Sequence, residues 1–157
     1  MTRFVSRIVI CVSFLLPVLL LAVAGSAAAQ PGVRGGVSID PDQAYFGAHY
    51  ETAPLIDRLY FRPNVEAGVG DDLTHVGLNM EFVYKFPRRR QGWVLYVGGG
   101  PAVNFYTFDR PGDNDTNTEG GLNLMIGVEH SRGWMFEIKV GALDSPDVKF
   151  GVGWTFR

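Results

Sequence analysis

Apolar and polar residues alternate with a period of two along most of the chain after residue 32. This period puts successive side chains on opposite faces of an extended strand, whereas an amphipathic helix repeats every 3.6 residues. Clusters of Gly, Pro, Asp, Asn and Ser separate the alternating runs and are typical of turns. We therefore predict an all-β fold with eight antiparallel strands in up-and-down order, at about residues 33–40, 43–52, 58–69, 73–86, 92–106, 119–130, 133–142 and 146–156.

Alternation alone leaves two kinds of barrel open. A soluble lipid-carrying β-barrel would turn its apolar face inward, and a transmembrane β-barrel would turn it towards lipid. The apolar face holds too many large side chains for the interior of eight strands, which is only just wide enough for side chains. The polar face is rich in glycine and nearly charge-balanced, as a confined interior requires. We therefore expect it to line the lumen, with Asp40, Glu51, Glu66, Glu81, Glu129, Glu137, Arg34, Arg62, Lys85, Lys139, Lys149 and Arg157 as its charged members.

The aromatic residues support the interpretation as a transmembrane barrel. With an even number of strands, both ends of the barrel domain lie on one side, and Trp93, Trp134 and Trp154 are then all expected at that side. Tryptophan favours membrane interfaces because it combines an apolar body with a polar tip. The same topology puts the polar stretch Asp109–Thr118 at the opposite, outer end, where we expect it to form the longest loop.

The first residues have the three parts of a secretory signal. Arg3 and Arg7 precede an apolar run from Ile8 to Ala24, and small residues follow as far as Ala29. We predict a cleaved signal peptide over 1–29 rather than a retained anchor, because the run is short and contains Pro17. The remaining domain, 30–157, has 12 basic and 16 acidic side chains and no cysteine. This composition disfavours nucleic-acid binding and excludes a disulfide framework.

The chain after residue 29 resembles the small eight-stranded outer-membrane barrels, the OmpA-like and OmpX-like group. The segment Val148–Arg157 is similar to the C-terminal strand that the barrel-insertion machinery reads, although Arg157 follows the aromatic Phe156. The stretch Tyr96–Pro101 also resembles a segment of this group. The resemblance implies a monomeric cell outer-membrane protein of Gram-negative type. Its partners would be outer-membrane lipid and the insertion machinery, and its role structural, adhesive or protective of the envelope, or that of a narrow pore.

One set of residues has the types of a hydrolase triad, namely His130, Ser131 and Glu137. Some small outer-membrane barrels that this chain resembles remove acyl chains from lipid A, but in them one residue separates the His from the Ser. Strand parity also turns His130 outward and Glu137 inward, so the three groups do not converge. We therefore predict a protein that is not an enzyme and has no catalytic residue, with a lipid A-modifying hydrolase as an alternative.

The other candidate residues receive structural interpretations. Asp109, Asp113, Asp115 and Glu119 could collect Ca²⁺, but their spacing departs from a calcium loop, so we predict a solvated loop and a surface ligand at 109–119. We expect His49 and His75 to be structural lumen residues. Gly98–Gly100 predicts a bend or bulge, and Arg88–Arg90 a solvated turn close to lipid phosphates. No cofactor and no metal are predicted.

Overall fold

The computed structural model describes residues 29–40, 42–70, 73–87, 91–110, 113–143 and 146–157, and the side chains of 73 and 108–116 are not described. Residues 1–28 lie outside this set, so the signal peptide stays a prediction. Within the described residues, no helix is long and apolar enough to cross a membrane. Eight strands account for nearly all of the described chain: β1 (Gln30–Ile39), β2 (Gln43–Glu51), β3 (Leu59–Val69), β4 (Leu73–Lys85), β5 (Trp93–Arg110), β6 (Asp113–His130), β7 (Trp134–Leu143) and β8 (Val148–Thr155).

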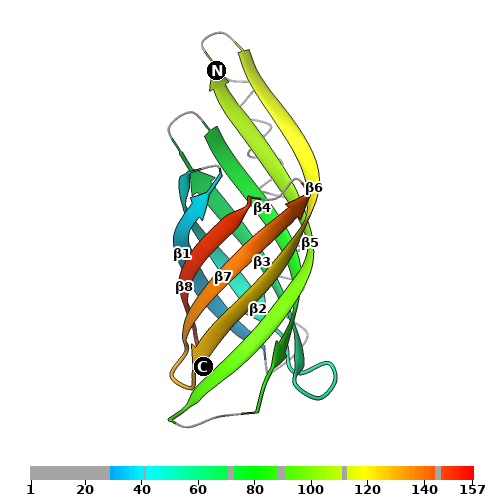
Figure 1. The fold of residues 1–157 in the computed structure, drawn as a ribbon, viewed down its shortest axis with the longest axis vertical. Coiled ribbons are helices and arrows are strands. Elements are labelled where there is room, and N and C mark those ends of the chain that lie inside the picture. The colour runs from blue at the N-terminus through cyan, green and yellow to red at the C-terminus, as the bar shows by residue number, and fades with distance from the viewer. Residues whose placement is uncertain (1–28, 41, 71–72, 88–90, 111–112, 144–145) are drawn as a thin grey trace.

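Each strand pairs antiparallel with the next one, and β1 pairs with β8, so the sheet closes into a barrel (Figure 1). The predicted eight-stranded up-and-down fold is confirmed. Closure leaves no free strand edge along the barrel wall, which matters for a sheet whose outer face is apolar.

The two faces of the strands differ as the alternation predicts. Arg62, Glu66 and Glu81 in β3 and β4 are fully buried in the lumen. On the outer face Phe46 is 65% exposed and Leu124 is 57% exposed, as are most other large apolar side chains of the wall. A soluble lipid carrier needs the opposite arrangement, so this alternative is ruled out.

The tryptophans gather at the end where β2, β4, β6 and β8 finish. Trp134 pairs with Trp154 across β7 and β8, and their rings meet edge to face at 4.7 Å between centroids. Trp93 packs on the ring of His130 at 4.8 Å. The predicted aromatic cluster at one end is confirmed, and we call this end the tryptophan end.

The predicted loop at Asp109–Thr118 is wrong. β5 and β6 are both 18 residues long and stay in register up to the pair Arg110–Asp113, so most of this stretch is strand. Asp and Asn disfavour strands on average, but Tyr106, Thr116 and Thr118 favour them, and the two strands pair continuously. Strand pairing therefore continues as far as Arg110 and Asp113, the last described residues on either side.

The glycine stretch Gly98–Gly100 does not make a bulge, because the register between β4 and β5 is the same on both of its sides. The backbones come close here instead: a Cβ on Gly100 would collide with the carbonyl oxygen of Met80. Glycine is needed at this position because only a residue without a side chain permits that approach.

Candidate functional site

The lumen contains ten buried or nearly buried charged side chains, which form two groups. We call the first the central cluster; its members come from β1, β3, β4, β7 and β8, and they are Arg34, Glu66, Glu81, Glu137, Lys139 and Lys149. Their side chains are at most 5% exposed. With three acids and three bases the cluster is neutral, as a buried group of charges must nearly be.

Contacts in the central cluster cross the lumen. The Arg34 Nη1 atom lies 2.9 Å from Glu137 Oε1 and 3.4 Å from Glu66 Oε1. The Lys139 Nζ atom lies 2.6 Å from Glu66 and 2.7 Å from Glu81, and Lys149 Nζ lies 2.9 Å from Glu66. Arg34 also lies 3.5 Å from Glu81, and Lys139 lies 3.7 Å from Glu137, so each carboxylate meets at least two cations. Removing a single member leaves a neighbour with uncompensated charge.

The second group, the terminal cluster, lies at the tryptophan end and consists of Glu51, Arg62, Lys85 and Glu129. Arg62 binds Glu51 through Nε at 3.0 Å and binds Glu129 through Nη2 at 2.8 Å. Lys85 Nζ contacts the same two carboxylates, at 2.6 Å and 3.0 Å. Two acids and two bases again balance. Arg157 adds a further contact to Glu129 at the mouth of the barrel.

Tyr96 joins the two clusters. Its hydroxyl donates a hydrogen bond to Glu137 Oε2 at 2.9 Å, and the Arg62 guanidinium lies 4.9 Å from its ring centre. The ring has room because its neighbour on β6 is Gly127, where a Cβ would collide with it. This explains why glycines and long side chains share the polar face.

Beside the central cluster, and beyond it away from the tryptophan end, the lumen also holds neutral polar side chains. Asn123 donates to Asn79 at 2.6 Å, and Asn79 donates to Asn64 at 2.7 Å. His75 bonds the Asn104 side chain at 2.9 Å and stacks on Tyr106. Near the tryptophan end, His49 bonds Thr155 at 3.0 Å. Both histidines have protein partners, so their predicted structural roles agree with the contacts.

One predicted lumen charge is misplaced. Asp40 is exposed and has a φ of 48° in the turn after β1. Asp tolerates this left-handed conformation better than most residues do, which explains why it ends the strand instead of lining the lumen. The other predicted lumen charges are in the two clusters or, like Arg157, at their edge.

The residues of the suspected triad do not meet. Glu137 pairs with Gly127 in register, three residues along β6 from His130, a separation of about 10 Å. Its carboxylate is buried in the central cluster, whereas Ser131 is exposed in a turn and His130 packs against Trp93 outside the lumen. This arrangement supplies no nucleophile–base–acid relay.

The β5–β6 hairpin extends beyond the rest of the barrel (Figure 1). β7 accompanies β6 only as far as the pair Leu143–Gly121, so the β7-side edge of Asp113–Gly120 has no strand partner among the described residues. The side chains of Asp109, Asp113 and Asp115 are outside the described set, and Glu119 is half-buried. Among the described residues, no three acidic, His or Cys side chains are close enough to hold a metal ion.

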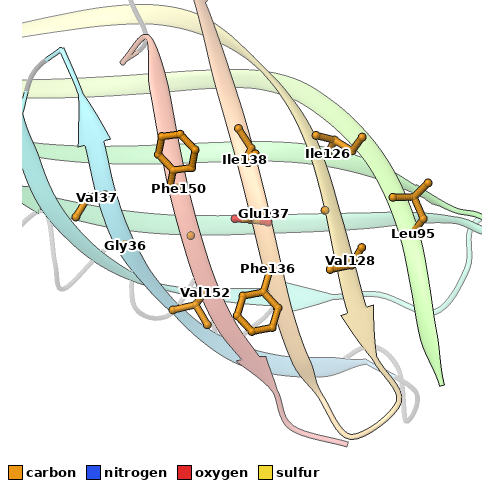
Figure 2. Close-up of a pocket in the computed structure, with 12 residues that line it drawn as sticks. Gly36, Val37, Leu95, Ile126, Val128, Phe136, Glu137, Ile138, Phe150 and Val152 are labelled. Carbon is orange, nitrogen blue, oxygen red and sulfur yellow. The ribbon is translucent and has the colours of Figure 1, made fainter. Parts of the chain in front are cut away.

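An open groove of about 630 Å³ lies on the outer face of β1, β5, β6, β7 and β8. In Figure 2 apolar side chains such as Phe136, Ile138 and Phe150 line it, and Gly36 lies beside Val37 on β1. Glu137 also lines the groove, but its carboxylate points into the lumen, where it contacts Arg34. The groove is therefore part of the apolar outer wall of the barrel.

No family model and no curated protein matches the sequence. Solved structures do match. The N-terminal β-barrel domain of OprF from Pseudomonas aeruginosa superposes with a TM-score of 0.63 at 15% identity, covering 82% of this chain and 96% of that one. This is the fold of the small eight-stranded outer-membrane barrels. Neisserial surface protein A (TM-score 0.57, 14% identity) and Ail of Yersinia pestis (0.52, 13%) each cover 82% of this chain and 96% or 97% of their own. The predicted resemblance is confirmed at the level of the fold.

Proposed function

We propose that this chain is a non-enzymatic integral protein of the outer membrane with a structural role in the envelope, inserted by the barrel-insertion machinery after cleavage of its signal peptide. The observation that carries the proposal is the pairing of an apolar outer wall with a lumen filled by two neutral charge clusters. Such a barrel fits lipid outside and has ion pairs where a pore would have water. A monomer suffices, since closure already satisfies all the wall strands.

Membrane fractionation of a Gram-negative host that expresses the whole chain tests the location. We expect the folded chain in the outer membrane, with the altered electrophoretic mobility on heating that closed barrels show. Recovery as a soluble periplasmic monomer would contradict the proposal. Planar-bilayer recording tests the lumen: because charged side chains from opposite walls meet in it, we expect no large, stable conductance. A steady open channel would favour the narrow pore instead.

The hairpin tip is the candidate site for a surface ligand, since it is the segment of the described chain that rises farthest from the barrel. Loops and tips on rigid scaffolds are common places for binding residues. The structural role and the ligand-binding role can be separated in a strain that lacks the gene, with sensitivity to detergent as the measurement. A chain shortened at the hairpin should restore a purely structural role fully. It should not restore a role that depends on recognition.

The lipid A hydrolase is tested with labelled lipid A and purified protein, alongside a Ser131→Ala variant. We expect no acyl release from either protein. Release that disappears in the variant would overturn the non-enzymatic assignment.

A further inference from the structure

The ionisable residues outside the lumen are divided by sign between the two ends of the barrel. Among the described residues, the tryptophan end carries three arginines and one acid: Arg58, Arg132, Arg157 and Asp57. The opposite end of the described chain carries seven acids and one arginine: Asp40, Asp42, Asp109, Asp113, Asp115, Glu119, Asp147 and Arg110. Since both lumen clusters are neutral, the molecule has one basic end and one acidic end.

The basic end is also the aromatic end. Arg132 is exposed and lies two residues before Trp134, whose side chain is 47% exposed on the outer wall. Arg157 directly follows Phe156, which is 52% exposed. Interfacial aromatic rings mark the depth of lipid headgroups, so the arginines lie where phosphates are found.

The β2–β3 connection adds an independent feature. Leu55 is 53% exposed and Ile56 is 71% exposed, in a tight turn that the hydrogen bond from Leu55 N to Leu59 O closes at 2.8 Å. Arg58 follows them, with a side chain 42% exposed and an Asp57 oxygen 3.9 Å away. Two bare apolar side chains beside a cation suit a lipid surface, where acyl chains and phosphates occur together. If the partner were instead an acidic protein, the Arg58 side chain would be matched, but Leu55 and Ile56 would stay exposed to water.

We propose that the tryptophan end binds the headgroups of anionic phospholipids in the leaflet next to it, through Arg58 and Arg132 with Leu55 and Ile56 anchored in the acyl region. Arginine suits this role because its planar guanidinium binds phosphate oxygens in pairs. Arg157 contributes less, since it is engaged with Glu129 and with the His130 carbonyl oxygen. The acidic end repels the same lipids, so the preference is confined to one leaflet. The inference rests on the proposed membrane location.

The test uses the folded mature chain in phosphatidylcholine vesicles with spin-labelled phosphatidylglycerol or phosphatidylcholine. Electron paramagnetic resonance of the motionally restricted lipid gives the relative association constant of the two. We expect a preference for phosphatidylglycerol of at least about fivefold at low salt, the effect of one basic residue at a charged membrane surface. Orientation in the vesicle does not matter, because both leaflets contain the label.

Two variants and one control locate the effect. Arg58→Gln alone should lower the preference. Arg58→Gln with Arg132→Gln should bring it close to one. The control, Asp40→Asn with Asp147→Asn, changes the other end and should leave the preference intact.

A preference near one in the folded, inserted wild type would overturn the proposal, as would an undiminished preference in the variant that combines Arg58→Gln with Arg132→Gln. If the wild type shows no preference but binds soluble polyglutamate through the same arginines, its partner is an acidic polypeptide and the lipid assignment is wrong. A chain that does not insert into vesicles refutes the membrane location itself, which the heat-dependent mobility distinguishes from the other outcomes.

Discussion

The lumen and the tip of the β5–β6 hairpin use the same alternating strands, but their polar residues have different consequences. In the lumen, Arg34 meets three carboxylates and is almost wholly buried. On the hairpin, the Asn117 side chain donates a hydrogen bond to the Glu119 carboxylate, and Asn117 is exposed. Charge in the lumen is therefore part of the fold. An exposed polar side chain on the hairpin, such as that of Asn117, has no part in the buried charge clusters.

Removal of a central lumen charge is expected to have the largest effect on stability. Arg34→Met leaves Glu66, Glu81 and Glu137 with only Lys139 and Lys149 to balance them. Loss of one partner from a buried ion group costs about 3–5 kcal/mol, so the free energy of unfolding should fall by this amount. Urea unfolding in lipid vesicles measures it. Arg132→Met, the same exchange at an exposed site, should change stability by no more than about 0.5 kcal/mol.

A double variant checks the cause. Arg34→Met combined with Glu137→Gln removes one charge of each sign and should recover part of the loss. Equal instability of the single and double variants would mean that packing, not charge, makes Arg34 important.

The outer wall should respond to charge nearly as strongly. Ile138 lies at the middle of β7 and is 43% exposed on the apolar face. Ile138→Lys places an ammonium group at mid-membrane depth, which destabilises such barrels by about 2–4 kcal/mol. The exposed hairpin residue Thr118 provides the matched position, where Lys should have little effect. Equal, small effects at both sites in vesicles would contradict a lipid-facing wall.

Loss of a neutral asparagine from the lumen should lower the stability by a smaller amount. Asn79 donates to Asn64 and accepts from Asn123, so Asn79→Ala leaves one acceptor and one donor without their partner. Each buried group left unsatisfied costs about 1–3 kcal/mol, and the total loss should be nearer the lower figure if the two neighbours rearrange. Asn117→Ala on the hairpin serves as the control, with no measurable loss of stability. A loss as large as that of Arg34→Met would show that the amide chain, not the charge cluster, dominates the lumen.

The comparison also shows what a sequence pattern can predict. Period-two alternation fixes which residues share a face, and the excess of acids and bases on one face shows that it is enclosed. For this reason Glu66, Lys139 and their neighbours could be assigned to the lumen in advance. Their actual partners could not, because strand tilt and register bring together residues such as Arg34 and Glu137, which are 103 positions apart.

Residue composition alone gave a wrong prediction near residue 113, because it ignores how the segment pairs with its neighbouring strand. Asp, Asn and Gly near residue 113 resemble a loop, yet the same stretch contains Thr116 and Thr118, and its partner strand supplies Tyr106 and Thr107. The Pro111–Gly112 pair is a strong turn signal and, given more weight than the acids around it, would have predicted a long hairpin. The role of Tyr96 was also missed, because the glycines after it obscured the parity of that strand.

The smallest effect on stability is expected from shortening the hairpin tip, although this variant alters more residues than the others. Replacing Phe108–Asp115 with Asn-Gly joins Thr107 to Thr116, which are already paired, through a two-residue turn of the kind that hairpins favour. The removed segment lies beyond the last β7 partner, so no lumen contact of either cluster is lost. Unfolding free energy should therefore change by less than about 1 kcal/mol, within the range of surface changes. Urea unfolding and heat-dependent mobility of the shortened chain measure this change. A loss of several kcal/mol would show that the hairpin folds as one unit with the barrel, and its edge would then be unsuitable as an independent recognition element.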